Sequence, residues 1–160
     1  MSILSMSEQE ESLRNSALKE FPNGNCAQAT AFALLNEFNL PENQLKNALY
    51  GFGGGIHLMG NTCGAVTGTL AAVGVISDKF GLDDEKKSNL LDELIVEAQK
   101  EFPSFFCRDL IGGVPKELFK KMKEGKMDKN EMEKFMKICN NIVGNFPIIA
   151  LRILKQYQPR

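Results

Sequence analysis

The sequence lacks the features that mark nucleic-acid-binding, membrane and secreted proteins. It has 19 Lys and Arg residues against 20 Asp and Glu residues, so no surplus of positive charge is available to neutralise phosphates. Its longest apolar stretch, around residues 65–76, is interrupted by threonine and glycine and is shorter than the roughly 20 residues that cross a bilayer. Residues 1–11 contain neither the basic region nor the apolar run of a signal peptide. We therefore expect a cytoplasmic protein that binds neither nucleic acid nor membranes.

Short motifs for metals, nucleotides and hydrolysis are also absent. The four cysteines contain no Cys-x-x-Cys pair, which is the local spacing typical of metal and dithiol sites. The glycine-rich segment 51–55 follows a predicted helix rather than a strand, and residues 64–68 lack the lysine of a phosphate-binding loop. The single histidine, His57, completes no recognisable Ser-His-Asp arrangement. It could coordinate a metal or move a proton, although a surface histidine is the simpler interpretation.

Helix signals fill almost the whole chain. Ser7 and Glu10 have the spacing of a capping box, and Gly81 is a natural helix terminator. No stretch alternates in the manner of a strand. We expect helices over about residues 7–20, 25–38, 41–50, 63–80, 83–101, 104–111, 115–122 and from 128 onward, with Pro147 either starting a final helix or kinking the preceding one. The prediction is a compact, all-α, single-domain helical bundle over residues 1–160, with a glycine-rich loop before a central helix.

The central helix is predicted to pack closely against a neighbour. Gly64, Gly68 and Ala72 recur every fourth residue and so lie on one helix face. Without large side chains there, another backbone can approach closely. Helix packing is also the simplest explanation for Gly74.

The cysteines are the best candidates for chemistry. Cys26 and Cys63 follow turn residues at predicted helix starts, and Cys107 lies in the first turn of its helix beside Arg108. Each of these positions favours the ionised thiol through helix dipoles or a nearby cation. Cys139 differs, because it lies on an apolar helix face. Permanent disulfides are not expected in a reducing cytosol, so the residues leave open reactive thiols, metal ligands and buried inert thiols.

The cysteine order and the glycine segment resemble a known family. The chain contains Cys63-Gly64-Ala65-Val66-Thr67-Gly68, preceded by Gly51-Phe52-Gly53-Gly54-Gly55-Ile56. Asn25-Cys26-Ala27-Gln28-Ala29, Cys107-Arg108-Asp109-Leu110-Ile111-Gly112 and Cys139 complete the pattern. Over about residues 20–155 the chain is similar to a family of four-cysteine proteins with a Cys-Gly-Ala-x-x-Gly motif (C_GCAxxG_C_C type), which is named for a redox activity.

The resemblance implies an all-helical fold with redox activity or metal binding at these cysteines. It points to Cys26, Cys63 and Cys107 as catalytic thiols, and to the same three with Cys139 as metal ligands. Room for a cofactor is expected at Gly53, Gly54, Gly55 and Gly64. The chain is also similar to the cluster-bearing part of split-Soret cytochromes, which implies an iron–sulfur cluster. It departs from the family at His57-Leu58, where relatives have Gly-Arg, so His57 inherits no family role.

Three functions are therefore expected in order. The first is a redox or metal-binding protein in which Cys26, Cys63 and Cys107 converge with Cys139 nearby, with an iron–sulfur cluster or another metal for electron transfer. The second is a metal-free thiol–disulfide oxidoreductase in which Cys63 attacks and a neighbouring cysteine resolves. The third is a non-catalytic helical interaction module whose cysteines fill the core. A redox partner protein is expected for the first two, and a homodimer is left open.

Overall fold

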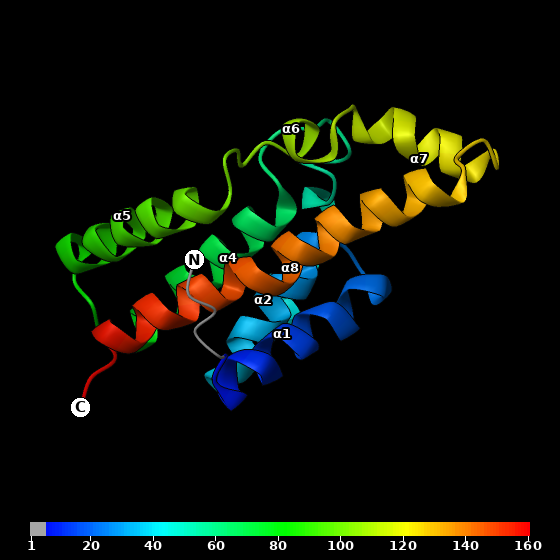
Figure 1. Ribbon diagram of the computed structural model, residues 1–160. Helices are drawn as coiled ribbons and strands as arrows, with labels where there is room; N and C mark the ends of the chain where they lie inside the picture. Colours follow the sequence, from blue (N-terminus) through cyan, green and yellow to red (C-terminus); the bar gives the residue numbers. More distant parts are fainter. Residues whose placement is uncertain (1–5) are drawn as a thin grey trace.

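A computed structural model describes residues 6–160, and the regular structure there is entirely helical (Figure 1). Thr62 and Phe106 form an isolated antiparallel bridge, and no strand occurs in this part of the chain. The all-α prediction is confirmed. The helices are α1 (Glu8–Glu20), α2 (Cys26–Glu37), α3 (Asn43–Ala48), α4 (Gly64–Lys79), α5 (Asp84–Glu101), α6 (Cys107–Ile111), α7 (Pro115–Lys123) and α8 (Lys129–Tyr157), with 3₁₀ turns at Phe21–Asn23 and Tyr50–Phe52.

Side-chain caps fix where the long helices begin. Ser7, Asn25 and Asp128 each close a capping box with a Glu or Gln three residues later. Asp83 accepts a hydrogen bond from the backbone N–H of Lys86 at the start of α5. Such caps satisfy amide groups that have no partner within the helix, so the predicted starts lie within a residue or two of the observed ones.

Two local predictions need correction. Of the two alternatives for Pro147, the start of a new helix is wrong, because α8 continues through it from Lys129 to Tyr157. Phe146 and Pro147 are both buried, and packing of this segment offsets the hydrogen bond that proline removes. Ser104 does not cap α6; its hydroxyl accepts a hydrogen bond from Phe106 N–H, and the helix begins one residue later at Cys107.

The longest helix, α8, runs along the whole bundle (Figure 1). Helices α2 and α4 pack against each other and against α8, and α1 packs on α2 and α8. Helix α5 lies along the C-terminal half of α8, whereas α7 lies beside its first turns (Figure 1). The core at the centre is made of fully buried side chains such as Leu34, Ile76, Leu94, Phe146 and Leu151. This arrangement gathers the starts of α2, α4 and α6 around the first half of α8.

Helix α1 is tied to α8 by an ion pair. Arg152 Nε donates to Glu10 Oε1 at 2.7 Å, and the Glu10 side chain is almost completely buried. Hydrogen bonding from Arg152 lowers the pKa of Glu10. The two residues are 142 positions apart in the chain, so this contact joins its two ends.

The N-terminal prediction concerns residues 1–11, of which residues 1–5 lie outside the described part. Across residues 6–160, none of the helices combines the length and the apolar character needed to span a membrane.

Candidate functional site

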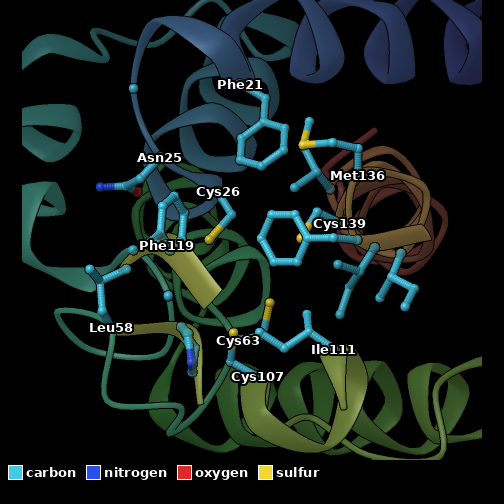
Figure 2. A pocket seen from close by; sticks show the side chains of 18 of the residues that line it. Phe21, Asn25, Cys26, Leu58, Cys63, Cys107, Ile111, Phe119, Met136 and Cys139 are labelled. Carbon is cyan, nitrogen blue, oxygen red and sulfur yellow. The ribbon is translucent and has the colours of Figure 1, made fainter. Parts of the chain in front are cut away.

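All four cysteines line one pocket of about 580 Å³ (Figure 2). Cys26 is the first residue of α2, Cys63 precedes the first residue of α4, Cys107 begins α6, and Cys139 lies within α8. In Figure 2 the four thiols face a common space, with Phe21, Phe119 and Met136 around it. Residues separated by more than a hundred positions in sequence therefore share one cavity.

Cys26 lies at the best-stabilised position for a thiolate. Hydrogen-bonding interactions with Cys63 and with the backbone at Gly54, Ala27 and Gly64 outweigh burial and lower the pKa of Cys26 to about 6. The starts of α2 and α4 meet at this sulfur, and the amide dipoles of both helices favour negative charge there.

Cys63 behaves in the opposite way from the prediction. The neighbouring Cys26 and burial raise the pKa of Cys63 well above its usual value. The backbone at Ala65 opposes the shift. A nearby anion and burial both disfavour a second thiolate, and here they outweigh the effect of the helix start.

The other two thiols stay protonated at neutral pH. Burial raises the pKa of Cys107 to about 11 and that of Cys139 to about 12. The expected help from Arg108 does not arise, because its guanidinium donates to the carbonyl of Gly60 and to Asn61 Oδ1. Cys139 lies on a half-buried face of α8, facing the pocket.

The glycines of the motif allow α2 and α4 to touch. A Cβ atom at Gly64 would lie 2.5 Å from Cys26 Sγ, and one at Gly68 would lie 2.1 Å from the carbonyl oxygen of Ala27. Both distances are too short for any side chain, so glycine is required at the two positions. Thr30 Oγ1 also donates to the Ala65 carbonyl across this contact. Gly74 has no atom within 4 Å of such a Cβ, so the packing explanation is confirmed for Gly68 and wrong for Gly74.

The glycine-rich segment folds into a left-handed turn over residues 54–58. The φ angles are 64°, 69°, 60°, 46° and 66° along Gly54, Gly55, Ile56, His57 and Leu58. Left-handed backbone costs a residue with a side chain about 1–2 kcal/mol. Backbone bonds such as Leu58 N–H to the carbonyl of Gly53 and Gly60 N–H to that of Gly54 hold the turn. No sequence signal marks Ile56 for this conformation, because β-branched residues normally avoid it.

Only some of the glycines that were expected to make room for a cofactor line the pocket. Gly53, Gly54, His57 and Leu58 line the pocket. Gly55 does not line it, because its Cα faces the backbone of Asn61, 2.4 Å from where a Cβ would lie. Gly64 lies directly against the Cys26 sulfur and leaves no space for a further group at that point.

The four thiols are candidate ligands for a metal. Thiolates are suitable ligands for zinc and iron–sulfur clusters. Within residues 6–160, however, no three or more His, Cys, Asp or Glu side chains are grouped closely enough to hold a metal ion. The four thiols as they lie here therefore do not fit a four-ligand centre.

Comparisons with known proteins agree with the cysteine pattern. The model of the family described as "Putative redox-active protein (C_GCAxxG_C_C)" matches residues 24–153, a range that includes all four cysteines. A curated protein of Archaeoglobus fulgidus, described as "Uncharacterized protein", is 35% identical over 88 residues. The match covers 54% of this chain and 58% of that relative, so less than two thirds of the relative's length is matched. No solved structure matches the chain.

Proposed function

Because the chain belongs to the redox-active C_GCAxxG_C_C family, we propose that it is a thiol–disulfide oxidoreductase in which Cys26 attacks and Cys63 resolves. One observation carries this proposal: Cys26 and Cys63, at the starts of the closely packed helices α2 and α4, line one open pocket, and each cysteine shifts the pKa of the other. The lowered pKa of Cys26 makes it a thiolate at neutral pH, and the thiolate is the attacking species in exchange reactions. The roles are thus the reverse of those expected from sequence.

The reaction proceeds in two exchanges. The Cys26 thiolate attacks one sulfur of a substrate disulfide, forming a mixed disulfide and releasing the other half as a thiolate. The negative charge has then left Cys26, so the pKa of Cys63 falls and its proton passes to the released thiolate. Cys63 next attacks the Cys26 sulfur, closing the Cys26–Cys63 disulfide and releasing the second half, which takes a proton from water. The thiolate–thiol pair loses two electrons and one proton, and the substrate gains these together with a second proton from water.

A second candidate is a metal or iron–sulfur centre for electron transfer. The observation in its favour is that four thiols from four helices line one pocket. Within residues 6–160, however, no three or more candidate ligands are grouped closely enough to hold a metal ion, so we place this candidate after the dithiol. A partner protein that returns electrons, a cytoplasmic location and a homodimer stay predictions under either function.

Anaerobic purification followed by metal analysis and an absorption spectrum separates the two candidates. The dithiol proposal expects a colourless, metal-free protein that consumes one equivalent of disulfide and yields a Cys26–Cys63 bond in peptide maps. Cys63→Ser should trap the mixed disulfide on Cys26, whereas Cys139→Ser, the matched control, should react like the wild type. Stoichiometric iron whose visible absorption disappears in each Cys→Ser variant would establish the cluster instead. Four unreactive thiols would favour an interaction module.

A further inference from the structure

Apart from the Cys26 thiolate, the pocket has no permanently charged side chain among its described lining residues, so it offers no fixed cation to an anionic ligand. Among the described residues that line it, none is Asp, Glu, Lys or Arg, and its titratable groups other than the thiols are His57 and Tyr50. An anionic group entering a site of this kind loses its hydration without gaining a counter-ion, which is strongly unfavourable. The thiolate at Cys26 adds repulsion for any anion.

The side chains of Asn25 and Gln28 in the lining are already engaged by the protein. Asn25 Oδ1 accepts from the N–H groups of Ala27 and Gln28, and its amide donates to the carbonyls of Leu49 and Tyr50. The Gln28 amide donates to the carbonyl of Lys46, and its oxygen accepts from Asn25 N–H. These groups hold the loops in place and have little capacity left for a polar ligand.

The remaining walls are aromatic, aliphatic and thioether groups. They come from the first 3₁₀ turn, from α7 and from the first half of α8: Phe21, Phe119, Met122, Phe135, Met136 and Ile142. Phe119 and Phe135 meet edge to face with ring centroids 5.9 Å apart. A volume of about 580 Å³ lies within the range that holds a small organic molecule, and apolar walls of this kind provide most of the binding energy there.

We propose that the oxidant of the Cys26–Cys63 pair is a small, uncharged, largely apolar disulfide that binds in this pocket. The inference depends on the proposed exchange function and adds its substrate class. It excludes disulfides with several negative charges as good substrates, because the described lining has no Lys or Arg to pair with them and the Cys26 thiolate repels them. The attack is the exchange described above, with the neutral disulfide as the group that is reduced.

Two aromatic disulfides of similar size test the proposal. Dithiodipyridine is uncharged at neutral pH, whereas dithiobisnitrobenzoate carries two carboxylates. Stopped-flow rates with the reduced protein at pH 7 are each divided by the rate of a small free thiol with the same reagent, which removes intrinsic reactivity. We expect the normalised rate for the neutral reagent to be higher by about tenfold or more, because the charged one enters without compensation.

Two lysine substitutions, one inside the pocket lining and one outside it, test whether the charge of the lining sets the preference. Met122→Lys adds a cation at the half-buried end of α7, within the lining, and should reduce the preference by accelerating the dicarboxylate. Val96→Lys adds the same charge on the exposed face of α5, at a residue that is not part of this lining, and should leave the ratio unchanged. If the normalised rates of the wild type with the neutral and the dicarboxylate reagent were nearly equal, the proposal would be overturned, whether or not the variants fold.

Peptide mapping separates this failure from failure of the exchange function. A Cys26–Cys63 disulfide formed at equal normalised rates by both reagents would overturn the substrate class and leave the exchange function standing. If neither reagent produced that disulfide, the exchange function itself would be wrong. An equal response of Met122→Lys and Val96→Lys would assign the preference to net charge and also overturn the pocket assignment.

Discussion

Cys26 shows that the direction of N–H groups, more than helix position, decides the state of a thiol. The four thiols share one pocket, yet the pKa is about 6 for Cys26, about 11 for Cys107 and about 12 for Cys139. For Cys26, hydrogen-bonding interactions with Cys63 and with the backbone of three residues lower the pKa. All four thiols are buried to some degree. Burial disfavours the charged form and therefore raises the pKa values of the other three thiols.

This difference predicts a distinct pH profile for Cys26. The thiolate fraction grows as pH rises through the pKa, so alkylation of Cys26 by iodoacetamide should level off above about pH 6–7, while Cys107 and Cys139 react slowly throughout. Cys63→Ala removes the thiol that lowers the pKa of Cys26 most strongly. The inflection in the pH profile of Cys26 alkylation should therefore move to higher pH. Cys139→Ala, as a control, should leave the inflection in place. Rates followed by peptide mass mapping provide the measurement, and an unshifted profile in Cys63→Ala would contradict the assignment.

Among the helices, the contact between α2 and α4 determines the geometry of the site. Gly64 and Gly68 bring the α4 backbone against Cys26 and Ala27. This contact directs the Gly64 N–H at the Cys26 sulfur. The motif is therefore explained by packing and by chemistry at once, since the same close approach provides one of the donors that lower the pKa.

Two alanine substitutions on α4 should have opposite effects. Gly68→Ala forces a methyl group into the Ala27 carbonyl and should lower the free energy of unfolding by about 1–3 kcal/mol or more. Gly74→Ala meets no atom within 4 Å and should raise that free energy by about 0.5–1 kcal/mol, because alanine is the better helix former. Urea titrations followed by circular dichroism measure both. Equal effects of the two substitutions would show that the α2–α4 contact is looser than described.

Local sequence signals predicted most of the helices but not the details that tertiary contacts decide. Capping residues such as Ser7, Asn25 and Asp128 act within one turn of helix, so their positions are readable from the chain alone. Pro147 does not start a new helix, as one of the two alternatives had it, because burial between helices, rather than local propensity, keeps α8 continuous.

The sequence indicates where the cysteines lie relative to the helices but not what surrounds each sulfur. The turn residues before Cys26 and Cys63 correctly indicated helix starts. Which sulfur keeps the proton depends on donors that come from distant segments, namely Gly54 and Gly64 for Cys26. The left-handed turn at Ile56, His57 and Leu58 gave no signal, because its backbone is imposed by the surrounding hydrogen bonds and not by residue type.

For the molecule as a whole, the Glu10–Arg152 pair joins the first helix to the last. The pKa of Glu10 is lowered from its ordinary value of 4.5, so the pair stabilises the folded chain fully above that value. The contribution is lost as pH falls through the lower, folded-state pKa. Half of the Arg152 side chain is exposed, so solvent screening limits the pair to about 1 kcal/mol.

Glu10→Gln should therefore lower the free energy of unfolding by about 1 kcal/mol at pH 7. The difference in the free energy of unfolding between wild type and variant should become smaller below about pH 4.5, where the carboxyl of Glu10 takes up its proton in the unfolded state. Asp84→Asn, at an unpaired exposed carboxyl in the first turn of α5, is the control and should change stability less. Urea unfolding at several pH values tests this, and a difference that stays constant down to pH 3 would refute the ion-pair account.

The spread of the Cys26 donors along the chain has a consequence for protein synthesis. A growing chain exposes Cys26 before Gly54 and Gly64 have been made, and an unfolded cysteine has an ordinary pKa near 8.5. The nascent thiol is thus mostly protonated and slow to form mixed disulfides with other newly made chains. Reactivity appears only when the start of α4 docks on α2, and access is restricted once α7 and α8 complete the pocket. Under the proposed function, Cys26 would therefore become reactive toward disulfides only after the chain has folded.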